Sequence, residues 1–508
     1  MKLITLLLFA PLLVPPVDAH RPAGGERSPN VIIIMADDLG RSELGCTGSE
    51  RIRTPHIDRL RERGMLFTQA YSGSTVCAPS RCTLLTGQHT GHAQVRDNLE
   101  ERNFTGTPGD EGVERIGAWK KPPATGRWGG QLALRADTDT LARTLQDHGY
   151  ATCGVGKWGL GGPGSTGHPN RQGFDHWFGY LCQRNAHNYY PTHLDRNGER
   201  QELEGNDRSL TGALYATDLM IDDACAFIDR HREDPFFIYF ATPVPHLALQ
   251  VPDDSLAEYQ GLWEDPPYEG GAGYLPHPEP RAAYAAMVTR FDRDVGRLVD
   301  RLERHGLLEN TIIFLTSDNG STFDLGGYDP EFFDGTGGFR GAKTYMYEGG
   351  IRVPLIATWP GHIAPESTSD LVVANWDLFP TTLGLVGIEP PDGLDGIDFA
   401  PTLLGRGTQS DRDWLYWEYH SRRGMQAVRM GQWKGLRLEA HGNPEAPIEL
   451  YDLATDPNET TDVAAEHPDV VARINRIMIE ARTPSEVPRW NFSPEQRVDP
   501  TTSDESGS

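Results

Sequence analysis

The sequence contains few cysteines. Six occur among its 508 residues, all between positions 46 and 225, and their spacing shows no paired zinc pattern. Six are too few for a disulfide scaffold in a chain of this length, and the unpaired spacing argues against a structural zinc site. The length allows one large domain plus a smaller one, each with its own hydrophobic core.

Positive charge is scarce as well. Lysine and arginine number 47 against 72 aspartates and glutamates, which gives a formal net charge of -25 at pH 7. So acidic a protein is repelled by nucleic acid and by anionic membrane surfaces, because both are polyanions. We therefore expect neither nucleic acid nor a membrane among the partners.

Long apolar runs are absent after the first twenty residues. The opening run, "LITLLLFAPLLV", follows Lys2 and precedes the small-residue stretch "PPVDA", which predicts a secretory signal peptide over residues 1–19. The alternative is an N-terminal buried helix. The run is too short to span a bilayer, and it is interrupted by Pro11. The protein is thus predicted to be secreted or periplasmic, and the polar stretch 491–508 is predicted to be a disordered tail.

Two segments far apart in the chain share one construction. "NVIIIMADDLG" (30–40) and "NTIIFLTSDNG" (310–320) are β-branched apolar runs that end in polar residues and a glycine, as in strands buried on both faces. Helical patterns alternate with short strands between them. This predicts an α/β domain over 28–388, with a mostly parallel sheet flanked by helices. A smaller α+β subdomain with an antiparallel sheet is predicted over 389–490.

Acidic and amide side chains follow both of these strands. Asp37 and Asp38 end the first, and Asp318 and Asn319 end the second. Ligands of such sheets bind beyond the carboxyl ends of the strands, so we expect these four side chains to lie together. Three carboxylates would repel one another unless a cation lay among them, and oxygen ligands favour Ca²⁺ or Mg²⁺. One acidic pair alone is more often a helix cap or a turn.

A short segment around Cys77 has a distinctive composition. In "STVCAPSRCTLLTG" (74–87) this cysteine could be a small buried apolar side chain or a thiolate nucleophile. Neither interpretation accounts for its neighbours. "CAPSR" followed by "LLTG" resembles the signature of type I sulfatases, members of the alkaline phosphatase superfamily. In that signature a dedicated enzyme oxidises the cysteine to formylglycine.

The resemblance runs from about Asn30 to about Leu453. It includes "ADDLG", "TPHIDRL", "GYATCGVGKW", "QGFDHWFGY", "PFFIYFATPVPHLALQVP", "TSDNG", "GAKTYMYEGGIRVP" and "ELYDLATDP", in the order that the family has them. It implies an alkaline-phosphatase-like fold and hydrolysis of sulfate monoesters, as in arylsulfatases and bacterial enzymes similar to N-acetylgalactosamine-6-sulfatase. The implied partners are a sulfated small molecule or glycan and, during biosynthesis, a formylglycine-generating enzyme.

The resemblance also assigns roles to individual residues. A hydrated formylglycine has two hydroxyls: one attacks sulfur to give a covalent sulfate ester, and deprotonation of the other then expels sulfate. Fixed cations would stabilise the charge of the transition state, and a histidine would protonate the departing alcohol. The implied Ca²⁺ ligands are Asp37, Asp38, Cys77 as formylglycine, Asp318 and Asn319; the implied catalytic residues are the nucleophile Cys77 with Arg81, Lys157, His246 and Lys343.

Three of these residues have simpler interpretations. In isolation Lys157 and Lys343 would be solvated surface charges, but their glycine-rich surroundings, "GVGKWGLGG" and "FRGAK", favour close approach to a small ligand. His246 lies between two prolines in "PVPHLALQVP" and could be a loop histidine bonded to the backbone. We favour the catalytic interpretation for all three.

The chain departs from the family at one position. The family commonly has histidine two residues after the lysine that matches Lys157, where it assists sulfate release, but this sequence has Gly159 there. We hypothesise that His187, or less favourably His193, supplies the missing base from another loop. Bulk water as the base, and a packing or surface role for both histidines, are the alternatives.

Several functions remain compatible with the sequence. Related members of the superfamily hydrolyse phosphodiesters or phosphonate monoesters, although phosphoryl transfer often recruits a second metal and this chain offers one clear acidic cluster. A protein of another class would bind sulfated glycans with Cys77 left unmodified. Both aryl and carbohydrate sulfates stay open as substrates, and the insertion 101–130, with its aromatic and basic residues, is the predicted substrate-contacting loop.

Overall fold

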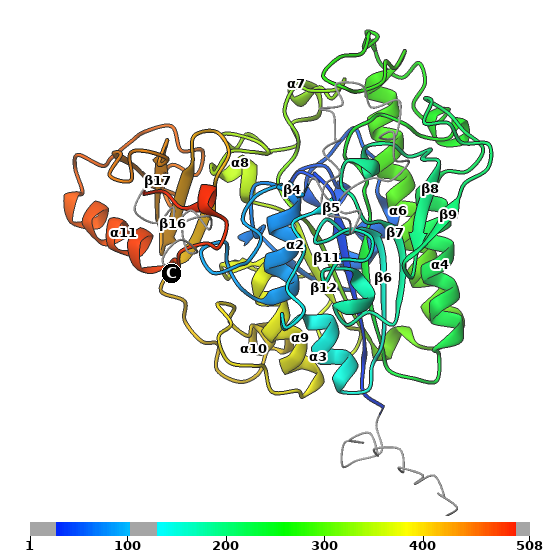
Figure 1. Ribbon diagram of the computed structural model, residues 1–508, viewed down its shortest axis with the longest axis horizontal. Helices are drawn as coiled ribbons and strands as arrows, with labels where there is room; N and C mark the ends of the chain where they lie inside the picture. The colour runs from blue at the N-terminus through cyan, green and yellow to red at the C-terminus, as the bar shows by residue number, and fades with distance from the viewer. Residues whose placement is uncertain (1–26, 102–129, 494–508) are drawn as a thin grey trace, which may run out of the picture.

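The computed structural model describes residues 27–101 and 130–493. Three predicted segments fall wholly or largely outside these residues: the signal peptide over 1–19, the substrate loop over 101–130 and most of the tail over 491–508. Figure 1 shows the described chain as a large α/β unit beside a small sheet that carries one helix.

A ten-stranded mixed sheet forms the centre of the large unit. Its five middle strands run parallel, whereas strands near both edges pair antiparallel. The prediction of a mostly parallel sheet is therefore confirmed. In spatial order the strands are β13 (Ser367–Ser369), β2 (Gly64–Phe67), β12 (Leu355–Thr358), β11 (Thr311–Ser317), β1 (Asn30–Ala36), β10 (Phe236–Ala241), β6 (Ala151–Lys157), β7 (His176–Tyr180), β8 (His193–Arg196) and β9 (Glu199–Glu202).

Helices cover both faces of this sheet. Strand β1 is buried throughout because alternate side chains enter two different cores: Ile32 and Ile34 pack on one face, and Val31 and Ile33 on the other. The first core contains α1 (Pro55–Glu62), α4 (Ala216–Arg230) and α6 (Pro280–Arg304); the second contains α2 (Cys77–Thr86), α3 (Leu141–Asp147), α9 (Leu378–Val386) and α10 (Ala400–Leu404).

A separate antiparallel sheet follows in the chain, as the sequence predicted. Its four strands pair in chain order, with α11 (Pro468–Glu480) packed on one face and the large unit against the other through Tyr71, Trp376 and Trp417. In Figure 1 it lies on the opposite side of the molecule from α4 and α6. The strands are β15 (Leu415–Tyr419), β16 (Met425–Met430), β17 (Trp433–Leu438) and β18 (Ile448–Asp452).

The division of the chain at residues 388 and 389 stays a prediction. Helix α10, beyond that point, packs in the second core of the large sheet through Ala400 and Leu403. Among the described residues, no helix is both long enough and apolar enough to cross a membrane. The remaining short elements are β3 (Ala70–Tyr71), β4 (Glu100–Glu101), β5 (Gly130–Gln131), β14 (Val373–Ala374), α5 (Asp253–Leu256), α7 (Pro330–Phe333) and α8 (Glu348–Ile351).

The register of the central strands brings distant residues to one edge. Ala36 at the end of β1 pairs with Ser317 at the end of β11, so the polar residues that follow both strands emerge side by side. Strand β6 ends at Lys157 on the same edge, one strand beyond β10. Helix α2 begins at Cys77. The carboxyl edge of the parallel sheet therefore gathers the predicted site.

Candidate active site

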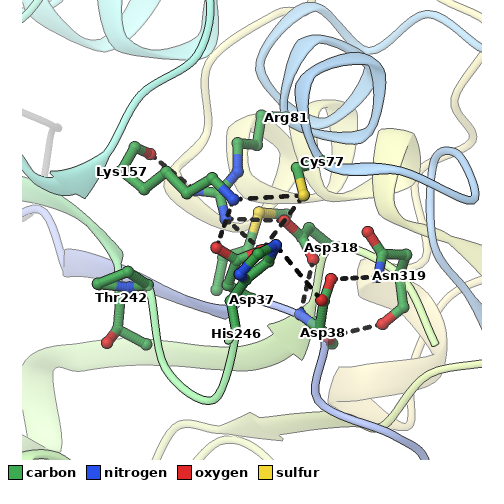
Figure 2. A network of polar contacts seen from close by, with 12 residues as sticks. Asp37, Asp38, Cys77, Arg81, Lys157, Thr242, His246, Asp318 and Asn319 are labelled. Atoms are coloured by element: carbon green, nitrogen blue, oxygen red, sulfur yellow. Dashed lines mark hydrogen bonds and ion pairs between the residues drawn. The ribbon is translucent and has the colours of Figure 1, made fainter. Parts of the chain in front are cut away.

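Cys77 is the first residue of α2 and lies at the centre of a buried polar cluster (Figure 2). Its side chain is 2% exposed. The sulfur lies 3.3 Å from Asp37 Oδ1, 3.3 Å from Lys157 Nζ and 3.7 Å from Lys343 Nζ. Residues from β6, from α2 and from two loops thus converge on one atom.

The two consecutive carboxylates reach the cluster because the backbone turns between them. Successive side chains of an extended strand point to opposite faces, but Asp38 has a φ of 67°, in the left-handed region. Asp37 therefore faces Cys77 while Asp38 reaches the neighbouring loop. Asn319 Nδ2 donates to Asp38 Oδ1 at 2.7 Å, and the Asp38 N–H donates to Asp318 Oδ1 at 3.1 Å.

Each of the three carboxylates forms an ion pair with a cationic side chain. Arg81 NH2 lies 2.8 Å from Asp318 Oδ2, and both side chains are fully buried. Lys157 Nζ lies 2.5 Å from Asp37 Oδ2, and Lys343 Nζ lies 2.7 Å from Asp38. Arg81 NH1 also donates to the main-chain oxygen of Lys157 at 2.7 Å, so the guanidinium has a fixed position. The predicted pocket residues are all brought together.

Burial and these charges shift several pKa values. Burial raises the pKa of the Cys77 thiol and Asp37 raises it further, although Lys157 and Lys343 oppose this. Burial alone would lower the pKa of Lys157, but Asp37 outweighs it and the net shift is upward. Asp38 does the same for Lys343 and raises its pKa well above the ordinary value. At neutral pH the lysines are charged and the thiol is protonated, so unmodified Cys77 is a poor nucleophile.

His246 faces the cluster from the loop after β10. Its Nε2 lies 3.6 Å from Asp38 Oδ2, and its Nδ1 lies 2.5 Å from the main-chain oxygen of Leu247. Because a carbonyl oxygen only accepts, Nδ1 carries the proton in the neutral ring and Nε2 presents its lone pair to the cluster. Burial lowers the pKa of His246 well below its usual value, and Lys343 and Lys157 lower it further.

The two histidines proposed as a replacement base lie in different surroundings. The ring of His187 packs against His246, with centroids 4.2 Å apart, and is stacked with Tyr274 at 6.1 Å. Burial lowers the pKa of His187 well below its usual value, and His246 lowers it further. His193 lies in β8, where its Nδ1 contacts Thr192 Oγ1 at 3.2 Å. The structure thus brings His187 to the cluster, and its role as a base stays a prediction.

The space beside Gly159 is filled by a residue that the sequence did not indicate. A Cβ atom built on Gly159 would lie 2.4 Å from Nε2 of Gln183 and 2.8 Å from its Cδ. The φ of Gly159 is 83°, which residues with side chains rarely adopt. A glutamine therefore lies where the family's histidine side chain would begin, whereas His187 lies against His246.

The residues around Asp37 fit a hard divalent cation. Asp37, Asp38, Cys77 and His246 offer potential ligand atoms that all lie within 4.8 Å of one another. The three cations already balance the three carboxylates, so charge alone does not require a metal. The stronger indication is Asn319, which is fully buried and whose Oδ1 has no hydrogen-bond partner among the described residues. An orphan amide oxygen beside carboxylates is a donor set that suits Ca²⁺ or Mg²⁺.

Comparisons with known proteins agree with this geometry. The family model described as "Sulfatase" matches residues 29–388, and the model for the C-terminal region of N-sulphoglucosamine sulphohydrolase matches residues 337–483. The chain belongs to the sulfatase family. It is accordingly a hydrolase with sulfatase activity on sulfate esters, and the sequence-based assignment to this family is confirmed.

Individual relatives cover most of the sulfatase chain. N-acetylgalactosamine-6-sulfatase of Mus musculus is 31% identical over 81% of this chain and 72% of its own length. N-acetylgalactosamine-6-O-sulfatase of Bacteroides thetaiotaomicron is 30% identical over 90% of this chain and 94% of its own. The crystal structure of Ps i-CgsB in complex with k-i-k-neocarrahexaose has a TM-score of 0.73 and 27% identity, covering 93% of this chain and 96% of that chain.

Three residues near the cluster were missed by the sequence analysis. Asn98 Oδ1 accepts the N–H of Ala78 at 2.9 Å, directly after the cysteine. Tyr274 stacks on His187, and Gln183 fills the space beside Gly159. The sequence held one indirect signal: glycine at a position where the family commonly has histidine indicates that another side chain fills the space, without showing which one.

Proposed function

We propose that this sulfatase is secreted and hydrolyses carbohydrate sulfate monoesters, with Cys77 converted to formylglycine by a formylglycine-generating enzyme. The observation that carries the proposal is the position of Cys77, buried at the start of α2 between Asp37 and two lysines. Burial keeps the thiol protonated there, so a modified side chain is needed for attack on sulfur. The proposed Ca²⁺ ligands are Asp37, Asp38, Asp318, Asn319 and the modified residue 77.

The bound groups supply what the protein side chains lack. When bound, Ca²⁺ would supply a charge that favours ionisation of a hydroxyl, and the hydrated aldehyde at position 77 would supply that hydroxyl. The protein holds everything else in place. Arg81 is fixed by Asp318 and by a main-chain oxygen, so its charge needs no rearrangement during the reaction.

The two lysines bind the sulfuryl group in this proposal. Both Nζ atoms lie within 3.7 Å of the Cys77 sulfur, so they reach the oxygens of a sulfate ester attacked from this position. Negative charge accumulates on those oxygens in the transition state, and fixed cations in a buried site stabilise it. Removal of one such group lowers the rate by about 10²- to 10³-fold in comparable sites.

His246 is the proposed acid for the departing alcohol. Leu247 holds its Nδ1, so Nε2 is the nitrogen that faces the cluster and must carry the proton that is transferred. Burial, and after it the two lysines, lower the pKa of His246 and so disfavour the charged ring in the free protein. A bound sulfate ester brings negative charge to the same place, which favours protonation of the ring when the substrate is present.

Carbohydrate sulfates are the proposed substrate class because of the relatives. Two of them bear names that specify N-acetylgalactosamine-6-sulfate esters, and Ps i-CgsB binds an oligosaccharide. The half-buried Tyr274 beside His187 offers an aromatic surface at the same site. Sugars stack on such surfaces through their apolar faces.

The test compares protein made with and without a formylglycine-generating enzyme. Mass spectrometry should find an aldehyde at position 77 only in the first preparation, and hydrolysis of sulfated sugars should scale with the modified fraction. Cys77→Ala, made with the same enzyme, is the inactive control. Full activity of the unmodified thiol would refute the mechanism, and faster hydrolysis of phosphonate monoesters than of any sulfate ester would refute the substrate class.

A further inference from the structure

Gln183 is buried in the loop after β7, where hydrogen bonds and an ion pair hold the backbone. Its side chain is 4% exposed. Its backbone N–H donates to Gln131 Oε1 at 3.0 Å, and its carbonyl oxygen accepts the N–H of Ala186 at 3.1 Å. The next residue, Arg184, forms an ion pair with Glu100 at 2.7 Å. The loop after β7 is thus held in place on both sides of Gln183.

The amide nitrogen of Gln183 is the group in this loop that the fold leaves without an acceptor. Its Nε2 is buried and has no hydrogen-bond partner among the described residues. An unpaired buried donor costs free energy, so each such group in a folded protein calls for an explanation, and a bound water, ion or ligand is one. Among the described residues nothing accepts from this nitrogen, so it is available to a ligand.

The surroundings of Gln183 connect it with the sulfate pocket on two sides. Its amide packs on Gly159, two residues beyond Lys157, whose Nζ contacts Cys77. On the other side, Gln131 belongs to β5, and the adjacent Leu132 N–H donates to Leu99 O at 2.8 Å. The neighbouring Asn98 binds the N–H of the residue after Cys77. Gln183 thus contacts two segments, and other residues of those segments or of their neighbours contact the nucleophile and Lys157.

The ligand that fits this place is a tetrahedral oxyanion. Arg81, Lys157 and Lys343 bring three cations to the pocket, each paired with a carboxylate, and an amide N–H adds a directional donor without adding charge. An amide cannot accept the proton released with sulfate. Gln183 is accordingly suited to binding oxygens and not to general base catalysis.

We infer that Gln183 donates its side-chain N–H to an oxygen of the sulfuryl group, and that Gly159 is required to make room for this amide. The inference rests on the proposed function and deepens it by naming a sulfate-binding residue. It separates two tasks: Gln183 binds the anion, while the proton acceptor must be a different group.

The test measures binding of inorganic sulfate by isothermal titration calorimetry to the full-length protein. Gln183→Met keeps the volume beside Gly159 and removes the donor, and Gln183→Glu replaces the donor by a negative charge. We expect sulfate binding to weaken by about 10-fold or more in the first variant, as for a hydrogen bond to a charged group, and further in the second. The control is Gln260→Ala, an exposed glutamine that binds Glu279, which should bind sulfate like the original protein.

A double-mutant cycle tests the link with Gly159. The Cβ of Gly159→Ala would lie 2.4 Å from the amide nitrogen, so this variant should also bind sulfate more weakly. In Gly159→Ala combined with Gln183→Ala no amide remains to be displaced, so the double variant should bind sulfate no more weakly than Gln183→Ala alone. Thermal unfolding of each variant separates loss of binding from loss of folding.

The outcomes distinguish this inference from the proposed function. Weaker sulfate binding in Gln183→Met, with equal thermal stability, supports the inference even if no sulfate ester is hydrolysed. If the original protein hydrolyses sulfate esters and both Gln183→Met and Gln183→Glu bind sulfate as tightly as it does, the inference is overturned and the function stands. Independent, additive effects of the two positions would overturn the role assigned to Gly159.

Discussion

Asp318 and Asn319 are adjacent in the chain, but their side chains have different partners. Asp318 forms a fully buried ion pair with Arg81, whereas the Asn319 Oδ1 atom has no partner among the described residues. Loss of one member of a buried pair leaves the other charge uncompensated, at a cost of about 3–5 kcal/mol. The two residues therefore offer a way to separate metal binding from folding.

We predict that Asn319→Ala weakens Ca²⁺ binding and lowers the melting temperature less than Asp318→Ala does, because it removes the hydrogen bond to Asp38 but leaves no cation without its nearest carboxylate. Asp318→Ala should both abolish Ca²⁺ binding and lower the melting temperature, because Arg81 loses its nearest carboxylate and keeps only Asp37, at 3.7 Å. Calorimetric titration with Ca²⁺ and thermal unfolding in the presence of a chelator measure the two effects. Equal Ca²⁺ affinity in Asn319→Ala and the original protein would remove Asn319 from the metal site.

A second prediction concerns the paired histidines. If His187 accepts a proton during sulfate release, His187→Ala should give a burst of alcohol product stoichiometric with modified enzyme, followed by slow turnover. His246→Ala should instead slow the burst itself, most strongly for poorly acidic leaving groups. Rapid-quench kinetics distinguish the two patterns. Normal steady turnover of His187→Ala would leave water or His193 as the base.

Some residues of the site could be predicted from the sequence and others could not. Asp37, Asp38 and Asp318 could be predicted because they follow strands, and parallel strands end at one edge. Gln183 could not, since its position depends on packing against Gly159 across two loops. A polar residue in a loop has no periodicity, and its partner becomes visible only in the folded chain.

Helix α11 packs on the small sheet through a buried apolar cluster, and it approaches the strand most closely at one glycine. A Cβ atom at Gly435 in β17 would lie 2.6 Å from Cγ2 of Ile474, a fully buried residue of α11. The helix can therefore approach the strand only because this position has no side chain. The contact between Ile474 and Gly435 therefore fixes where α11 lies on β17.

We predict that Gly435→Val pushes α11 away and lowers the free energy of unfolding by about 1–3 kcal/mol, as overpacked cores do. Adding Ile474→Ala to this variant should recover part of the loss, because the valine then fills the space that the isoleucine vacates. Urea denaturation measures both changes. Strictly additive losses in the double variant would show that the two side chains do not compete for space.

At the same scale, strands with continuous apolar or aromatic sequences were predicted well. The buried strand β1, the strand β11 and the four strands of the small sheet all lie within the segments expected from their apolar patterns. Their sequences are rich in β-branched and aromatic residues, which fit a pleated surface. The edge strands β13 and β9 are short and polar, so only pairing with neighbours defines them.

The charge of the whole molecule bears on its choice of substrate. A net charge of -25 repels a polysulfated glycan, although the pocket itself is rich in cations. We predict that kcat/KM for a polysulfated oligosaccharide rises when NaCl is increased from low concentration, because salt screens long-range repulsion. A monosulfated sugar should respond much less. A steep fall of kcat/KM with salt for the polysulfated substrate would instead indicate a basic surface that guides it to the site.

The pairing of β1 with β11 also sets an order of events during synthesis. The site cannot close around Cys77 until residue 317 has been made, 240 positions later, because β11 carries Asp318 to the edge where β1 ends. At about 5–20 residues per second, translation of that interval takes roughly 10 to 50 seconds. If Cys77 is modified as proposed, the modifying enzyme has access to the nascent segment during this interval, whereas Cys77 is 2% exposed in the finished fold. Slower ribosomes would lengthen that interval, and faster closure of the sheet would then leave more of the protein unmodified.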